Sequence, residues 1–204
     1  YIGGDFYDIV QLNENMLAFI IMDVSGHGVK SAIIASMIKA IFQREMKSGD
    51  KIKNFFYKMN TEFQENIKTD DYLTSFLMTI DLKNKRLTYS NAAHPNPFLI
   101  KTNGDIVELE TNGFIIGILD KNFYGENSCS IEQGDKIVLY TDGIIETMGQ
   151  DEEPFGKKRL KEILKDNSFE QIEDIADTIM TELIIFSISP IFEDDLTLVI
   201  MEII

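Results

Sequence analysis

The chain has 204 residues, of which 44% are hydrophobic and 26% are charged, a composition typical of a globular domain with a substantial core. Its 34 acidic and 19 basic residues leave a net charge of −15, which repels phosphate backbones and anionic lipid, so we expect no binding to nucleic acid. No apolar run reaches the roughly 20 residues of a membrane span, and the single cysteine, Cys129, excludes an internal disulfide and a cysteine-rich zinc site.

The first third of the chain predicts one buried strand followed by two helices. Residues 17–24 (LAFIIMDV) are almost wholly apolar and lie between turn-forming residues, as in a buried strand. Apolar residues then recur every three or four positions over 33–42 and again over 52–67, with a break at Ser48-Gly49-Asp50. This spacing predicts two helices, each with one buried stripe.

From residue 73 onwards the pattern changes to short strands and tight turns. The Thr102-Asn103-Gly104 segment predicts a hairpin, because Asn-Gly between two apolar runs favours a tight turn. Two further helical patterns follow at 160–164 and 172–186. The expected strands of this part are 73–82, 86–94, 97–101, 105–110, 136–140 and 196–204.

The order of these elements does not alternate strand and helix, which argues against a doubly wound parallel sheet. We therefore expect an α+β fold in which antiparallel sheet carries packed helices. No linker or repeat divides the chain, so residues 1–204 are expected to form a single domain. The chain begins directly at a Gly-Gly-Asp motif, and we expect it to be a C-terminal fragment of a longer regulatory protein.

Aspartates stand beside three separate apolar strands and in the opening GGDFYD motif. One explanation is that aspartate commonly ends strands because it forms turns. The other is that several carboxylates converge on hard divalent cations such as Mg²⁺ or Mn²⁺, which prefer oxygen ligands. Neighbouring glycines favour the second explanation, because they let backbone pass close to an ion or phosphate. The candidates are Asp5, Asp8, Asp23, Asp142, Asp194 and Asp195.

Six motifs follow one another along the chain: GGDFYD at 3–8, DVSGHG at 23–28, NAAHPNP at 91–97, LYTDGIIE at 139–146, EPFGKKRL at 153–160 and DDLTLV at 194–199. In this combination they resemble the PPM-type (2C-like) metal-dependent serine/threonine protein phosphatases, specifically the bacterial SpoIIE/RsbU branch. The resemblance spans nearly the whole chain. It implies a four-layer α/β/β/α sandwich, in which two antiparallel sheets are flanked by helices.

The same resemblance implies a site for two divalent cations, Mn²⁺ or Mg²⁺, about 3.5–4 Å apart. Asp23 would bridge the ions, and a water between them would attack phosphorus in line without a covalent phosphoenzyme. The other implied ligands are the backbone carbonyl of Val24, Asp5 for the second ion, and Asp142 and Asp194 for the first, with Asp8 and Asp195 as outer-shell candidates.

The two histidines, His27 and His94, are candidate general acids for the leaving group. For each of them, a structural hydrogen bond at a helix start or a turn is the alternative. His94 ends an Asn-Ala-Ala-His motif where the branch usually has Asn-Ala-Gly-His, so Ala93 adds one methyl group. This departure puts close backbone packing at Ala93 in question.

The activity that the resemblance implies is hydrolysis of phosphoserine or phosphothreonine in a phosphorylated protein. The implied substrate is a STAS-type anti-sigma-factor antagonist, in a partner-switching pathway that regulates a sigma factor. An upstream sensor domain and a homodimer are further implied partners. A cytoplasmic location is expected, with no direct membrane insertion by this domain itself and with membrane tethering of the full-length protein as the alternative. The alternatives are a phosphatase-fold binding module with little activity and, because GGDFY is similar to the GGDEF signature, a nucleotide cyclase.

Residues 184–192 (IIFSISPIF) form an apolar stretch just before the last aspartates. One interpretation is a buried helix end followed by a turn. The other is an exposed patch at which a protein substrate or a second subunit docks.

Overall fold

The computed structural model describes residues 3–26, 28–48, 51–67, 70–119, 123–189, 192 and 194–204. The chain divides into two compact units, each containing one antiparallel sheet. The first unit comprises Tyr1–His94 and Glu110–Ser130, and the second comprises Pro95–Leu109 and Ile131–Ile204. None of the described helices combines the length and the apolar character required to cross a membrane.

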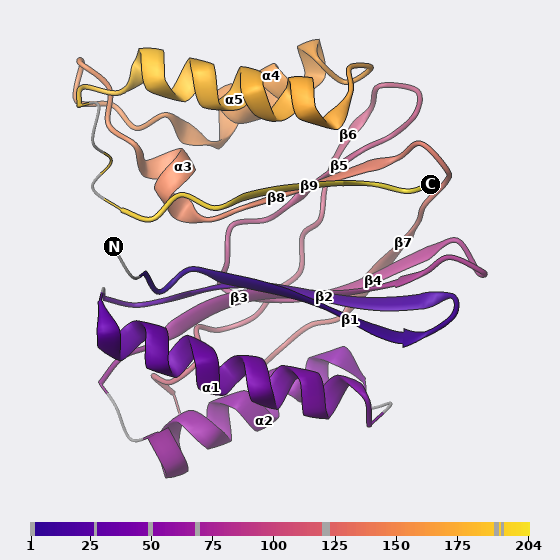
Figure 1. Ribbon diagram of the computed structural model, residues 1–204, viewed down its shortest axis with the longest axis vertical. Coiled ribbons are helices and arrows are strands. Elements are labelled where there is room, and N and C mark those ends of the chain that lie inside the picture. The colour runs from indigo at the N-terminus through magenta and orange to yellow at the C-terminus, as the bar shows by residue number, and fades with distance from the viewer. Residues whose placement is uncertain are drawn as a thin grey trace. The chain divides into compact units, whose positions relative to one another are not determined.

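The first unit contains a five-stranded sheet with the strand order β1-β2-β3-β4-β7 (Figure 1). All neighbouring strands are antiparallel, and β2 pairs with β3 along its whole length. The strands are β1 (Phe6–Asn13), β2 (Met16–Val24), β3 (Leu73–Asp81), β4 (Arg86–Ala92) and β7 (Asn127–Ser130).

One face of this sheet is covered by α1 (Val29–Met46) and α2 (Ile52–Glu62), which continues into the π-helix η1 (Phe63–Ile67) (Figure 1). Alternate β2 residues, among them Ile20 and Met22, share a buried cluster with the apolar stripes of both helices. The intervening residues of β2, such as Phe19, are buried as well. Burial of both faces explains why this strand is an uninterrupted apolar run rather than an alternating one.

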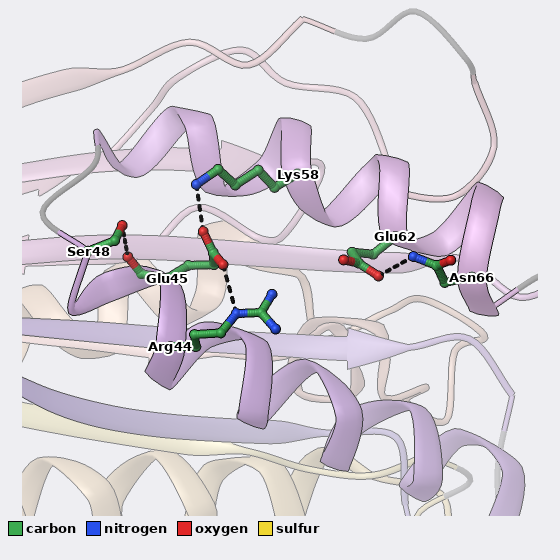
Figure 2. A network of polar contacts seen from close by, with 6 residues as sticks. All are labelled: Arg44, Glu45, Ser48, Lys58, Glu62 and Asn66. Carbon is green, nitrogen blue, oxygen red and sulfur yellow. Dashed lines mark hydrogen bonds and ion pairs between the residues drawn. The ribbon is translucent and has the colours of Figure 1, made fainter.

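A polar network links the two helices (Figure 2). Glu45 accepts hydrogen bonds from Lys58 Nζ at 2.5 Å and from Arg44 Nε at 2.9 Å. These two hydrogen bonds, the one from Lys58 first, lower the pKa of the Glu45 carboxyl. At the end of α2, Glu62 Oε2 accepts a hydrogen bond from Asn66 Nδ2 of η1 at 2.6 Å.

The second unit contains a four-stranded sheet with the order β6-β5-β8-β9. The apolar stripes of its two longer helices bury Tyr140 and Phe98 on one face of this sheet. The strands are β5 (Phe98–Ile100), β6 (Ile106–Glu108), β8 (Lys136–Tyr140) and β9 (Leu198–Glu202), and the helices are α3 (Asp142–Glu146), α4 (Gly156–Asp166) and α5 (Ile172–Phe186).

The hairpin predicted at Thr102-Asn103-Gly104 is confirmed. It joins β5 to β6, and Gly104 adopts a φ of +84° that favours glycine. A partly buried ion pair anchors its base, where Lys101 Nζ contacts Asp135 Oδ2. The Asp135 side chain is fully buried and also accepts hydrogen bonds from the backbone N–H groups of Thr102 at 3.0 Å and Glu132 at 2.8 Å.

The antiparallel α+β arrangement predicted from the sequence is confirmed. The structure adds three elements that the sequence pattern does not predict: the strands β1 and β7, and the short helix α3. Two of these carry aspartates of the candidate site at their start: Asp5 directly precedes β1, and Asp142 is the first residue of α3.

Candidate metal centre

The predicted ligands fall into two sets, one in each compact unit. Asp5, Asp23 and Val24 belong to the first unit, whereas Asp142 and Asp194 belong to the second. Among the residues that the structure describes, no group of three or more His, Cys, Asp and Glu side chains is arranged to hold a metal ion.

Asp23 is the penultimate residue of β2 and lies opposite Thr74 of β3. The segment that carries Asp5 runs directly beside it, since Val24 N donates to the carbonyl of Gly4 at 3.4 Å. A Cβ atom at Gly4 would lie 2.3 Å from the Val24 carbonyl oxygen and 3.2 Å from Asp23 Oδ1. Gly4, the second glycine of GGDFYD, is therefore required for the close approach of the Asp5 segment to Asp23 and Val24.

The turn after Asp23 is held by backbone contacts. Ser25 N donates to Tyr72 O at 2.9 Å, and Tyr72 N donates to Ser25 Oγ at 2.9 Å. Gly26 and Gly28 have φ angles of +84° and +89°, which explains both glycines of DVSGHG. His27, the candidate general acid between them, lies outside the described residues, and its role stays a prediction.

Asp8 makes a contact that the sequence does not reveal. In β1, its Oδ2 accepts a hydrogen bond from Gln43 Nε2 of α1 at 2.8 Å, and Lys39 Nζ lies 3.9 Å from its Oδ1. Asp8 thus connects the first strand of the sheet to the helix that covers it. Its predicted outer-shell role stays a prediction.

In the second unit, Asp142 begins α3, separated from the end of β8 by Thr141 alone. A Cβ atom at Gly143 would lie 2.2 Å from the Asp195 carbonyl oxygen, so the backbone before β9 passes directly over the start of α3. Two hydrogen bonds hold this arrangement: Thr141 N donates to Thr197 O, and Thr197 N donates to Thr141 Oγ1, each at 3.1 Å.

The carboxylates of this set interact electrostatically. Burial raises the pKa of Asp142, and the negative charge of Asp194 raises it further. Glu146 shares this environment, because partial burial and then the charges of Asp142 and Asp194 raise its pKa. A bound cation would offset the repulsion among these groups, so the donor set fits a divalent metal ion.

Glu146 was not among the residues predicted from the sequence. It stands four positions after Asp142, on the same face of α3. The spacing of four residues would have identified Glu146 as a neighbour of Asp142 only if the segment had already been known to be helical.

His94 is buried and belongs to a hydrogen-bonded turn. Its Nδ1 lies 2.8 Å from Thr74 Oγ1, while Asn91 Oδ1 accepts from His94 N and Asn91 Nδ2 donates to His94 O, each at 2.8 Å. This geometry supports the structural alternative for His94. Beside it, Ala93 is exposed and has a φ of +58°, so its methyl group meets an unfavourable backbone conformation rather than a packing clash.

The chain matches one protein family and is similar to proteins of known activity. The model of the stage II sporulation protein E (SpoIIE) family matches residues 13–204. The chain is 28% identical over 186 residues to the phosphoserine phosphatase RsbP of Bacillus subtilis (strain 168), covering 89% of this chain and 44% of RsbP. It is 26% identical over 203 residues to the phosphoserine phosphatase RsbU of the same organism, covering 98% of this chain and 59% of RsbU. The chain therefore spans less than two thirds of either relative.

Comparison with solved structures identifies the fold. The SiaA-PP2C domain of Pseudomonas aeruginosa superimposes with a TM-score of 0.85 at 20% sequence identity, covering 98% of this chain and 81% of that one. At this identity the likeness shows the fold alone. The 2C-type phosphatase fold predicted from the motifs is confirmed.

Proposed function

Because the chain belongs to the SpoIIE family of PP2C-type phosphatases, we propose that it hydrolyses phosphoserine or phosphothreonine in a phosphorylated protein. The resemblance to the SpoIIE/RsbU branch is thereby confirmed, and the family and fold favour a phosphatase over the nucleotide-cyclase alternative.

The observation that carries this proposal is the repulsive pairing of Asp142 with Asp194. Asp142 begins α3 and Asp194 precedes β9, and burial, followed by the negative charge of Asp194, raises the pKa of Asp142. Such an arrangement costs free energy unless a cation is bound. A binding site for a positive ion accounts for its presence.

We assign the proposed ligands as two sets. Asp5, Asp23 and the Val24 carbonyl would come from the first unit, and Asp142 and Asp194 from the second. Phosphatases of the PP2C family are metal-dependent, and Mn²⁺ or Mg²⁺ suits oxygen donors of this kind. When bound, the ions would neutralise phosphate charge and activate water for attack on phosphorus.

The remaining roles belong to the chain itself. Gly4 allows the Asp5 segment to lie against Val24, and Gly143 allows the Asp195 backbone to cross α3, so both glycines position carboxylates. Asp23 is the central residue of the proposed catalytic machinery, and His27 is the proposed general acid. Asp195 would act from outside the ligand shell.

The proposed substrate is a STAS-type anti-sigma-factor antagonist in a partner-switching pathway. Its support is the similarity to RsbP and RsbU, both named as phosphoserine phosphatases. An upstream sensor domain in the full-length protein belongs to the same proposal, and both relatives are longer than the part that matches this chain. A homodimer and a cytoplasmic location also belong to this proposal.

Two matched substitutions test the metal assignment. Asp23→Asn and Asp142→Asn should each reduce Mn²⁺-dependent hydrolysis of p-nitrophenyl phosphate at least 100-fold, because each removes one anionic ligand. Asp105→Asn, on the exposed β5–β6 hairpin, is the control and should retain full activity. Circular dichroism should show an unchanged fold in all three variants.

Full activity in either site variant would refute the assignment. A wild-type protein that binds Mn²⁺ in calorimetry but hydrolyses neither this ester nor a phosphoserine peptide would instead favour the binding-module alternative.

A further inference from the structure

The C-terminal end of α5 carries apolar side chains that the core does not use. Farther back along the helix, Ile179 and Leu183 are fully buried against the second sheet. At its end, the exposed fractions rise to 58% for Ile184 and 71% for Ile185. With Ile188 at 59% and Met148 at 43%, these residues form a surface that we call the α5 patch.

The α5 patch rests on a well-defined backbone. Ile188 N donates to Met148 O at 3.2 Å, and Gly149 pairs with Ser187 in an antiparallel bridge. A Cβ atom at Gly149 would lie 2.4 Å from the ring of Phe186, so this loop packs tightly against the helix end. The patch is therefore preorganised, which lowers the entropic cost of binding a partner.

An open pocket of ≈ 340 Å³ adjoins the patch. Its one basic side chain is already engaged, since the Arg159 guanidinium lies 4.1 Å from the centre of the Phe186 ring and donates to Phe155 O at 3.0 Å. The acidic side chains of the pocket, by contrast, belong to exposed residues. The pocket is lined by Gln150, Asp151, Arg159, Glu182, Ile185 and Phe186.

Exposed acids continue beyond the pocket, because Glu152 and Glu153 follow Asp151 in the same loop. An apolar surface with an acidic border complements an apolar side chain flanked by lysine or arginine. A second copy of this chain is a poor occupant of the α5 patch, because pairing through this surface would bring two acidic borders together, so the proposed homodimer would form through another surface.

The patch also lies near the proposed metal ligands of its own unit. Asp142 is joined to Met148 by the helix α3 and two further residues, a path of at most about 13 Å. A standard protein interface covers about 800 Å² per partner, a radius of about 16 Å. A protein bound with its phosphate at a metal ion held by Asp142 would therefore reach the α5 patch.

We propose that the α5 patch docks the phosphoprotein substrate, by holding an apolar side chain of the substrate that is flanked by basic residues. This inference rests on the proposed phosphatase function, and it adds the chemical character of the substrate that the enzyme selects.

Binding of synthetic peptides tests the docking directly, without any requirement for catalysis. The probe is a fluorescein-labelled phosphoserine peptide with a Lys-Leu-Leu-Lys segment, measured by fluorescence anisotropy. Ile185→Ser, Ile188→Ser and Glu182→Lys should each weaken its binding at least 10-fold. Ile33→Ser is the matched control, because Ile33 is 55% exposed on α1, and it should leave the affinity unchanged.

Equal affinity for all four variants would overturn the proposal, as would equal binding of a peptide in which glutamate replaces both lysines. A dimer that is seen by sedimentation and lost in Ile185→Ser would also overturn it, in favour of a second copy as the occupant.

Kinetics separate docking from chemistry. In Ile185→Ser, kcat/KM for the Lys-Leu-Leu-Lys phosphopeptide should fall at least 10-fold through KM, while hydrolysis of p-nitrophenyl phosphate stays unchanged. Equal loss on both substrates would overturn the docking role. If the wild-type protein hydrolysed neither substrate, the proposed function would fail, and the anisotropy measurements would still decide whether the patch binds this peptide class.

Discussion

Replacing Ala93 with glycine should stabilise the protein, although glycine substitutions usually destabilise. Ala93 has a φ of +58°, in the left-handed region where a Cβ atom crowds the backbone. The turn holds this conformation through the hydrogen bonds between Asn91 and His94 on either side. Because Ala93 is exposed, removing its methyl group sacrifices little buried surface.

The expected magnitude is the difference between two effects. The left-handed conformation costs an alanine about 1–2 kcal/mol. Glycine adds about 0.4–1 kcal/mol of conformational entropy to the unfolded chain. The central values of about 1.5 and 0.7 kcal/mol leave a net stabilisation of about 0.8 kcal/mol, within a range of about 0–1.6 kcal/mol. For a chain of this length, that corresponds to a rise in Tm of about 1–4 °C.

Urea unfolding followed by circular dichroism measures this difference, with Ala40→Gly as the matched control. Ala40 is exposed in the middle of α1, so the same substitution should destabilise there by about 0.5–1 kcal/mol. Opposite signs for the two variants would support the role of backbone strain. If Ala93→Gly destabilised as much as Ala40→Gly, the reasoning from φ would be refuted.

Two further predictions concern charged groups. Asp135→Ala should lower the free energy of unfolding in urea by about 3–5 kcal/mol, because it removes the fully buried carboxylate that accepts from Lys101 and from two backbone N–H groups; a loss below about 1 kcal/mol would contradict this. Glu45→Gln should destabilise by up to about 1 kcal/mol at pH 7, because it removes the charge paired with Lys58 (Figure 2). Since the folded-state pKa of Glu45 is lowered, this contribution is present above the ordinary carboxyl pKa and is lost as the pH falls through the lowered value. The difference between wild type and Glu45→Gln, measured by urea unfolding, should therefore shrink below about pH 4, whereas a difference independent of pH would contradict the assignment.

Elements with a strong apolar pattern were predictable from the sequence. An uninterrupted apolar run indicates that both faces of β2 are buried, and helical spacing indicates one buried face each for α1, α2, α4 and α5. The structure confirms these five elements. The segment 184–192 was ambiguous, because exposed and buried apolar residues look alike in a sequence. The structure shows that Ile184, Ile185 and Ile188 are exposed.

Two of the elements that the sequence does not predict, β1 and α3, lack a clear apolar pattern. The outer strand β1 is mostly exposed or half-buried, so its apolar pattern is weak, and its pairing with β2 alone defines it. The helix α3 has only five residues, too few to display a helical period.

The sequence by itself determined the family and the candidate ligands, because motif residues such as Asp23 and Asp142 are recognisable from their type and spacing. Tertiary structure decided what surrounds them. The contact of Gln43 with Asp8, the repulsion that Glu146 shares with Asp142, and the left-handed backbone of Ala93 each depend on elements packed together or on local torsion angles. Sequence spacing carries no information about such distances, since they arise only when the chain folds back on itself.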